Sequence, residues 1–229
     1  MIIGSGLLAR AFASSFENST SACIYAAGVS NSGCRDTMEY QREKLRLTDA
    51  LKRYEHADLF VYFGTCSVND PMANSTPYFQ HKVKMEQIVA NHPRHLILRL
   101  PQVAGRTANP HTLLNYIYSR ISRSERFQVW KNARRNIIDV DDIVRSAVSL
   151  ANEDGLRGEC VNIANFTDIA VPDIVEIMAR VVGKESVCEY LDCGDAYPID
   201  TERIRLVAKR CGVLFNPDYT EQVIRKYYA

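Results

Sequence analysis

The chain has 229 residues, 46% hydrophobic content and a formal net charge of +1 at pH 7. This length suits one large domain or a core domain with a small lobe, and the balanced charge gives no basic field to attract nucleic acid or an anionic membrane. No apolar run approaches the roughly 20 residues of a spanning helix, and no export signal is visible, so we expect no membrane partner and a cytoplasmic location. The seven cysteines lack metal-ligand spacing, so we expect reduced thiols and no metal.

Short apolar strands alternate with amphipathic helices in the first 100 residues, which indicates a parallel sheet covered on both faces. The expected strands are 1–3, 23–28, 58–63 and 95–100, and the expected helices are 7–16, 39–54 and 78–91.

After Pro101 the pattern loosens, and no internal repeat is visible. The expected elements there are helices at 113–123, 171–182 and most of 201–228, and strands at 127–130 and 161–164. Residues 137–142 read as a strand that runs into a helix ending at Leu150, with Asp141 as its cap. Gly183 is expected to close the helix 171–182.

Two glycines stand between the first apolar stretch and the first helix, in the pattern Gly4-x-Gly6-x-x-Ala9. Gly4 permits a tight turn, and Gly6 lets backbone N–H groups approach a pyrophosphate at the helix N-terminus, where the helix dipole favours anions. A turn of this kind also occurs without any ligand. The acidic residue that usually follows about 20 positions later to bind the adenosine ribose is missing, because that region reads Ile24-Tyr25-Ala26-Ala27.

Tyr78 and Lys82 lie four residues apart after Pro77, so a helix there places them on one face about one turn apart. An ammonium near a phenol favours the phenolate, so we expect Lys82 to lower the pKa of Tyr78 and make it a proton donor or acceptor near neutral pH. Thr65 follows the strand 58–63 and could hold a substrate oxygen. The three groups suit hydride chemistry at a sugar or alcohol carbon, although Tyr and Lys also meet at this spacing by chance.

Other reactive side chains have simpler interpretations. Cys66 has no basic neighbour in the sequence, so we expect a small packing residue rather than a redox group. His81 is expected on the surface of its helix, not in catalysis. Tyr227 and Tyr228 are expected as packing or surface residues.

Several motifs, in order along nearly the whole chain, resemble the extended short-chain dehydrogenase/reductase family of nucleotide-sugar epimerases, dehydratases and reductases. They are the glycine turn 4–9, the small-residue strand end 25–30, the hydroxyl motif 65–68, Tyr78-x-x-x-Lys82, the segment 99–105 and the block 135–142. This resemblance implies a Rossmann-like doubly wound parallel sheet with a small C-terminal α/β substrate lobe. It implies NAD or NADP as cofactor, a nucleotide-sugar substrate, a role in polysaccharide biosynthesis and a homodimer formed through the Tyr78 helix.

The resemblance also implies roles for individual residues. Thr65 would bind the sugar oxygen, Tyr78 would be the acid/base, and Lys82 would bind the nicotinamide ribose. The implied cofactor-binding residues are Gly4, Ser5, Gly6, Leu7, Leu8, Ala27, Gly28, Lys82, Pro101 and Val103. The implied substrate-binding residues are Ser67, Gln102 and Arg135, with Arg135 on the diphosphate or, alternatively, in a surface salt bridge.

The chain departs from the family pattern in its first half. About two strands and two helices are missing between the glycine turn and the strand 23–28, including the wall of the adenine pocket, so we expect weaker or differently posed cofactor binding. Cys66-Ser67 follow Thr65 in place of Asp-Glu, which argues against dehydration. The expected cofactor domain comprises 1–100 and about 137–164, and the expected substrate lobe comprises about 101–136 and 165–229.

The sequence therefore predicts an NAD(P)-dependent nucleotide-sugar epimerase or ketoreductase with a Thr/Tyr/Lys acid–base site. Two alternatives stay open. The shortened half could leave a catalytically impaired nucleotide-sugar or dinucleotide binding protein or subunit. A reductase of a carbonyl compound without a nucleotide would use the same three groups and ignore Arg135.

Overall fold

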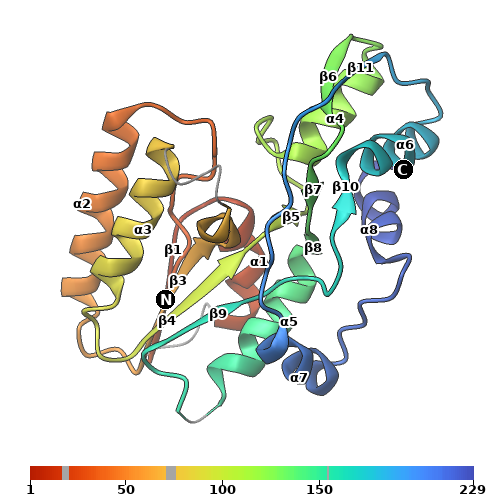
Figure 1. Ribbon diagram of the computed structural model, residues 1–229. Coiled ribbons are helices and arrows are strands. Elements are labelled where there is room, and N and C mark those ends of the chain that lie inside the picture. Colours follow the sequence, from red (N-terminus) through yellow and green to blue (C-terminus); the bar gives the residue numbers. More distant parts are fainter. Residues whose placement is uncertain (17–20, 71–75, 154) are drawn as a thin grey trace.

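The structure is a computed structural model that describes residues 1–16, 21–70, 76–153 and 155–229 (Figure 1). A five-stranded parallel sheet forms its centre. Its strands, in spatial order, are β1 (Ile2–Ile3), β2 (Ala22–Tyr25), β3 (Leu59–Thr65), β4 (His95–Leu100) and β9 (Glu159–Asn162). The middle strands are continuous apolar runs because helices cover the sheet on both faces, as the sequence predicted.

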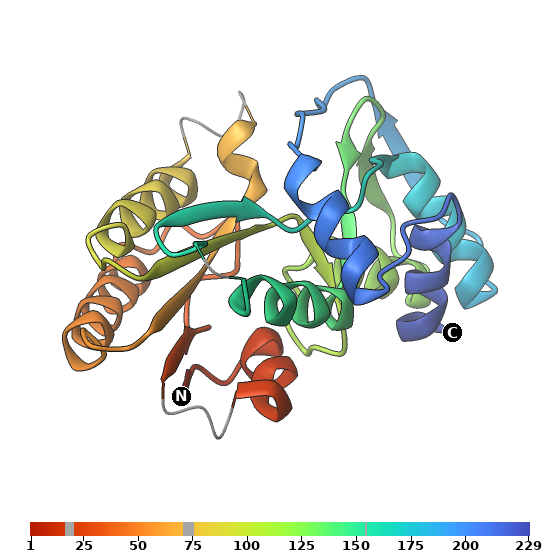
Figure 2. The ribbon, with the colours of Figure 1, turned by 90° about the horizontal axis from the view of Figure 1, so that it is seen from below.

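Alternation along the strands divides the sheet side chains between two hydrophobic clusters. On one face, Tyr25 of β2 and Tyr62 of β3 pack under α2 (Thr37–Arg53) and α3 (Pro77–Val89). On the other face, Ile24 and Val61 pack against α1 (Leu7–Phe16), α5 (Val140–Ala151) and α7 (Glu202–Cys211). Figure 2 shows these two groups of helices on opposite sides of the sheet.

A second cluster of elements forms a small lobe with its own apolar core. Three two-stranded pairs build it: β5 (Gln102–Ala104) with β8 (Ile137–Asp139), β6 (Phe127–Trp130) with β11 (Cys188–Leu191), and β7 (Arg134–Arg135) with β10 (Ile169–Ala170). Its helices are α4 (Leu113–Ser122), α6 (Val171–Val182) and α8 (Tyr219–Tyr228). Several of these short strands escaped prediction, because strands of two to four residues lack an apolar run.

Capping residues at the ends of the helices match the sequence-based predictions, except at α5. Thr76 caps α3 by accepting a hydrogen bond from Phe79 N, and Pro77 occupies its first turn. Gly183 ends α6 in the left-handed region, as predicted. The prediction that Asp141 caps α5 was wrong: Asp139 is the cap and accepts from Asp141 N, because β8 ends at Asp139.

The first half of the sheet is abbreviated, as the sequence indicated. One helix, α1, connects β1 to β2, and these two strands are direct neighbours in the sheet. Within the described residues, β1 is therefore the edge strand, and no strand lies beyond it. Also within the described residues, no helix is both long and apolar enough to cross a membrane.

Gly4 lets the turn after β1 touch the end of β2. Its φ is +131°, and a Cβ added there would lie 2.3 Å from the carbonyl oxygen of Ala26. Only glycine tolerates both the left-handed φ and the close backbone contact. Gly6, two residues later, has no atom within 4 Å of an added Cβ.

We predict that Gly4→Ala lowers the free energy of unfolding by roughly 2 kcal/mol or more, because the methyl group meets backbone rather than a movable side chain. This corresponds to a fall in Tm of about 4–8 °C for a chain of this size. Thermal and urea unfolding would measure it. The matched variant Gly6→Ala should change stability by less than about 0.5 kcal/mol; equal losses for both variants would contradict this account of the turn.

Candidate active site

The glycine turn leads directly into the N-terminus of α1. Gly4, Ser5 and Gly6 connect β1 to α1, whose first turn contains no acidic residue. Arg10 Nη1 donates to Ser5 O at 2.9 Å and fixes the back of the turn. The space beside Gly6 is open, so an anion could approach the first amides of α1 without meeting a side chain.

Tyr78 and Lys82 share one buried face of α3, as their spacing predicted. Tyr78 is 9% exposed and Lys82 is 3% exposed. The Lys82 ammonium lies 6.0 Å from the ring centroid of Tyr78 and 5.3 Å from that of Tyr62. It also reaches the end of β2, because a Cβ on Gly28 would lie 2.7 Å from Lys82 Nζ. Glycine at position 28 therefore leaves room for the Lys82 ammonium.

A buried carboxylate that the sequence-based reasoning missed lies beside this pair. Glu43 of α2 accepts hydrogen bonds from Val29 N at 2.7 Å and from Tyr62 Oη at 3.1 Å. It pairs with Lys82 Nζ at 3.3 Å and with His81 Nε2 at 2.8 Å. The expected surface position of His81 was wrong, since its side chain is only 6% exposed. The available signal was spacing: Glu43 precedes Leu47 and Ala50 on the buried face of α2.

The network keeps Glu43 ionised. Burial raises the pKa of this carboxyl, but the His81 hydrogen bond, the Lys82 charge and the Val29 amide together outweigh burial and lower it to about 2. Lys82 therefore faces an anion, and Glu43 with its neighbours Tyr62 and His81 forms what we call the Glu43 cluster.

The predicted lowering of the Tyr78 pKa was wrong. Burial raises the pKa of this phenol, and the charge of Glu43 raises it further, followed by Tyr40 and Tyr197. Burial is the main reason, and the Glu43 carboxylate beside Lys82 adds to it. Tyr78 is consequently protonated at neutral pH.

Thr65 ends β3 at the same edge of the sheet. Its Oγ1 lies 2.8 Å from Ser67 Oγ and accepts from Ser67 N at 3.2 Å, which caps a short 3₁₀-helix, η1 (Cys66–Asn69). Cys66 is fully buried, donates to Arg99 O, and has a pKa raised by burial, so it is an inert packing residue as expected.

A second ion pair anchors α3 on the sheet. Arg99 of β4 donates twice to Glu86 of α3, with Nη2 to Oε2 at 2.6 Å and Nε to Oε1 at 3.1 Å. A Cβ on Gly64 of β3 would lie 2.3 Å from Glu86 Oε1, so glycine is required there as well. Because Glu86 follows Lys82 by four residues, this bond sets the rotation of α3 that faces Tyr78 and Lys82 inward.

The predicted substrate residues lie where the sheet meets the small lobe. Gln102 and Val103 belong to β5, which begins just after Pro101 and pairs with β8. Arg135 lies in β7, and its Nη1 donates to the backbone oxygens of Arg134 at 2.6 Å and Asp195 at 3.1 Å. Among the described residues its hydrogen bonds go to backbone carbonyls rather than to a carboxylate.

Tyr197 is another buried residue near the predicted site that the sequence-based reasoning missed. It is buried in the segment between β11 and α7. Burial raises its pKa to about 12, against the opposing charge of Arg135. Since Tyr197 also raises the pKa of Tyr78, its phenol lies within electrostatic reach of both residues. Its position after β11 follows no motif, so only the folded chain reveals it.

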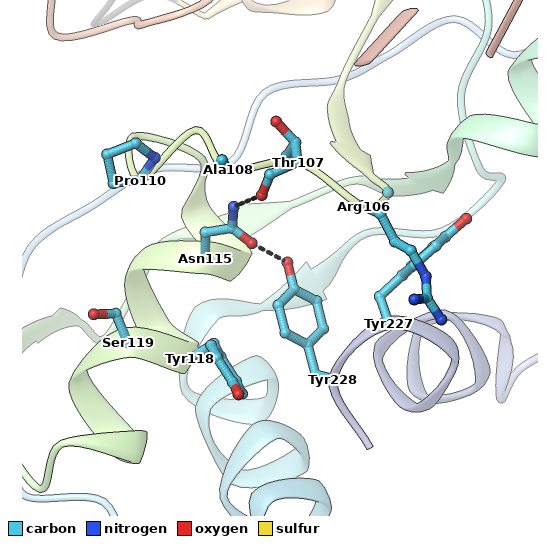
Figure 3. A pocket seen from close by; sticks show the side chains of 10 residues that line it. Arg106, Thr107, Ala108, Pro110, Asn115, Tyr118, Ser119, Tyr227 and Tyr228 are labelled. Carbon is cyan, nitrogen blue, oxygen red and sulfur yellow. Dashed lines mark hydrogen bonds between the residues drawn. The ribbon is translucent and has the colours of Figure 1, made fainter. Parts of the chain in front are cut away.

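Two cavities of the described residues lie away from the predicted site. One, of about 350 Å³, lies in the small lobe between the loop 105–110, α4 and the end of α8 (Figure 3). There Tyr228 Oη donates to Asn115 Oδ1, and Asn115 Nδ2 donates to Thr107 O, so Tyr228 packs as expected. The other, of about 310 Å³, lies between α5 and α8. Within the described residues, no group of His, Cys, Asp or Glu could hold a metal ion.

Solved structures share this fold. The chain is similar to UDP-glucuronic acid 4-epimerase from Bacillus cereus in complex with NAD, with 16% identity and a TM-score of 0.76 over 91% of this chain and 73% of that one. It is similar to RMD from Pseudomonas aeruginosa complexed with NADPH, with 18% identity and a TM-score of 0.70 over 90% and 79%. It is also similar to dTDP-glucose 4,6-dehydratase from Bacillus anthracis in complex with NAD, with 19% identity and a TM-score of 0.70 over 93% and 72%.

A search of curated proteins found no match. The family model described as "NAD dependent epimerase/dehydratase family" matches residues 10–164, which is more than half of the chain. This match includes Tyr78 and Lys82 and agrees with the family resemblance of the sequence. The protein belongs to the NAD dependent epimerase/dehydratase family.

Proposed function

We propose that this protein is an NAD(P)-dependent nucleotide-sugar epimerase or ketoreductase. One observation carries the proposal: the groups suited to the chemistry converge on the carboxyl edge of one parallel sheet. Thr65 ends β3, Gly28 follows β2 and meets Lys82, and Gly4 follows β1 and meets Ala26. In open α/β sheets, ligands bind in the crevice at this edge.

The residues present fit much of a dinucleotide. The open space at Gly6 and the amides of α1 suit the diphosphate, with Ser5, Leu7 and Leu8 beside it. Ala27, Gly28 and Lys82 would hold the nicotinamide ribose, and Pro101 and Val103 would line the junction with the substrate. No acidic residue stands in the stretch 24–28 to hold the adenosine ribose. When bound, the cofactor supplies or accepts a hydride.

The chain's own residues would manage the oxygen of the reacting carbon. Thr65 Oγ1 would donate a hydrogen bond to that oxygen and hold it against Tyr78. Tyr78 Oη would give its proton to a carbonyl oxygen during reduction, and an epimerase would also take it back during oxidation. Because burial raises the pKa of Tyr78, the phenol holds its proton at neutral pH before it meets a carbonyl oxygen. Ser67 and Gln102 would contact the sugar.

We propose a substrate that carries a diphosphate, because Arg135 offers a planar cationic fork near Tyr197 and is not neutralised by a described carboxylate. We also propose the division into a cofactor domain and a substrate lobe, because the sheet and the small lobe have separate apolar cores. Helix α7 packs on the core of the sheet. A cytoplasmic homodimer that acts in polysaccharide biosynthesis remains part of this proposal.

One observation favours a second candidate, a binding protein or subunit without turnover. Lys82 Nζ already bonds to Glu43 and Tyr62, so the ammonium that would contact the cofactor is engaged by the protein itself. A dinucleotide would have to share or replace those bonds.

We predict that Tyr78→Phe lowers kcat by about 10²–10⁴-fold, because the variant lacks the group that exchanges a proton with the substrate. Binding of the nucleotide sugar, measured by calorimetry, should be retained. Turnover within about twofold of the unchanged protein would remove Tyr78 from the mechanism. The exposed Tyr116, changed to Phe in parallel, is the matched control and should keep full activity.

We predict that NADH or NADPH raises Tm by about 5–10 °C at 100 times its dissociation constant, which corresponds to about 2.7 kcal/mol of linkage. Differential scanning fluorimetry with each cofactor measures the shift. Absence of any shift with both cofactors at millimolar concentration would favour the binding protein that takes only a nucleotide sugar.

We predict that Arg135→Ala raises KM for a nucleotide-sugar substrate by about 10–100-fold, since one charge-assisted contact contributes about 1.5–3 kcal/mol. Activity on a simple carbonyl compound without a diphosphate should not change. If the variant turns over both kinds of substrate as well as the unchanged protein does, the enzyme is a reductase of a non-nucleotide carbonyl.

A further inference from the structure

We propose that the cavity of the small lobe is a further ligand site, which takes a nucleoside monophosphate with its base on the rings of Tyr118 and Tyr228 and its phosphate on Arg106. The cavity has a volume of about 350 Å³. Because its lining shares no residue with the candidate active site, its occupation does not depend on the function proposed above.

Hydrogen bonds hold the walls of this cavity in place (Figure 3). Asn115 of α4 donates through Nδ2 to Thr107 O at 2.9 Å and to Asn109 O at 2.8 Å, which fixes the loop 105–110 on the helix. Its Oδ1 accepts from Tyr228 Oη of α8 at 2.7 Å. The fold itself therefore forms the space before any ligand arrives, as in most small-molecule sites.

The loop 105–110 is also fixed from the side of the sheet. Arg10 of α1 donates to Arg106 O, and Asn109 Nδ2 donates to Ser30 Oγ at 3.2 Å. These contacts hold the backbone of Arg106. Its guanidinium lines the cavity and, among the described residues, has no hydrogen bond or ion pair to another protein group, so its donors are available to a ligand.

Tyr118 and Tyr228 give the cavity an aromatic wall. Their ring centroids lie 5.2 Å apart, and the ring planes are inclined by 45°. Tyr118 is 39% exposed, so its ring keeps free surface beside Tyr228. A nucleobase is a planar π system that stacks on such rings, and stacking tolerates different bases.

The opposite side of the cavity is cationic. In the view of Figure 3, Tyr118 lies on one side of Tyr228, and Arg106 lies on the other. No acidic residue lines the cavity within the described part of the chain. A guanidinium offers a planar fork of donors that matches a phosphate group, so this side suits the anionic end of a ligand whose ring covers the tyrosines.

Size and polarity together select a mononucleotide. The volume lies near the lower end of the roughly 300–1,000 Å³ of ligand pockets, which leaves room for one nucleotide rather than for a dinucleotide or a nucleotide sugar. Thr107 and Ser119 add hydroxyl groups that can bond to a ribose. An aromatic carboxylate would leave these hydroxyls unused, and a sugar phosphate would leave the tyrosine rings uncovered.

Calorimetric titration with AMP and with its two halves tests the site. We expect one AMP to bind per chain with a Kd below about 1 mM. Adenosine and ribose 5-phosphate should each bind at least about tenfold more weakly, since each lacks one of the two contacts. UMP tests a smaller base. If neither AMP nor UMP binds at millimolar concentration, or if ribose 5-phosphate binds as tightly as AMP, the proposal is overturned.

Two variants with matched controls locate the bound nucleotide. Tyr118→Ala should weaken AMP binding at least about fivefold. Tyr116→Ala should leave it unchanged, because Tyr116 is equally exposed at 38% but packs against Phe127 outside the cavity. Arg106→Gln should weaken AMP binding by about 10–100-fold.

Arg135→Gln is the control for the arginine, because Arg135 belongs to the candidate active site and should leave AMP binding unchanged. If Arg135→Gln weakens AMP binding and Arg106→Gln does not, AMP occupies the substrate site and the proposal fails. It also fails if NADH displaces AMP and Tyr118→Ala leaves the affinity unchanged, because AMP then occupies the glycine turn. Tyr118 and Arg106 are exposed, so both variants should fold, and a retained Tm verifies this.

Discussion

The ionised carboxylate of Glu43, enclosed between α2, α3 and the end of β2, is the constraint on which the geometry of the site depends. Its partners come from α3, from β3 and from the backbone after β2, so these elements must dock together for the charge to be satisfied. The same contacts determine the side of α3 that faces the sheet. The Arg99–Glu86 pair, one turn further along α3, holds that orientation from the neighbouring strand.

Close backbone contacts at the ends of β1, β2 and β3 make room for this arrangement. Gly4 touches Ala26, Gly28 admits the Lys82 ammonium, and Gly64 admits the Glu86 carboxylate. Each glycine thus marks a place where a group from another element reaches the backbone, and the three lie along one edge of the sheet. The abbreviation of the first half leaves this edge of the sheet intact.

The small lobe is tied to the sheet by a second polar network. Asp139, at the junction of β8 and α5, binds Lys226 and Tyr227 of α8, and Asp142 accepts a hydrogen bond from Tyr219. Partial burial lowers the pKa of Lys226, but its hydrogen bonds to Asp139 and Asp141 outweigh that effect and raise the pKa. Asp139 serves both as the cap of α5 and as an anchor for α8.

The sequence by itself determined the order of the elements, the abbreviated parallel sheet, the shared face of Tyr78 and Lys82 and the special role of Gly4, since each depends on neighbours a few residues apart. The sequence did not predict the direction in which the pKa of Tyr78 shifts, the burial of His81 or the position of Tyr197 near Tyr78. Glu43 lies 38 residues before His81, and Tyr197 lies in a segment without a motif, so only the packing of α2 and α3 on the sheet brings these groups together. The cap of α5 is Asp139 and not the predicted Asp141, because β8 pairs with β5 as far as Asp139, opposite Ala104. The pKa of a buried group depends on the charges and hydrogen bonds of all the elements that pack around it, and these come together only in the folded chain.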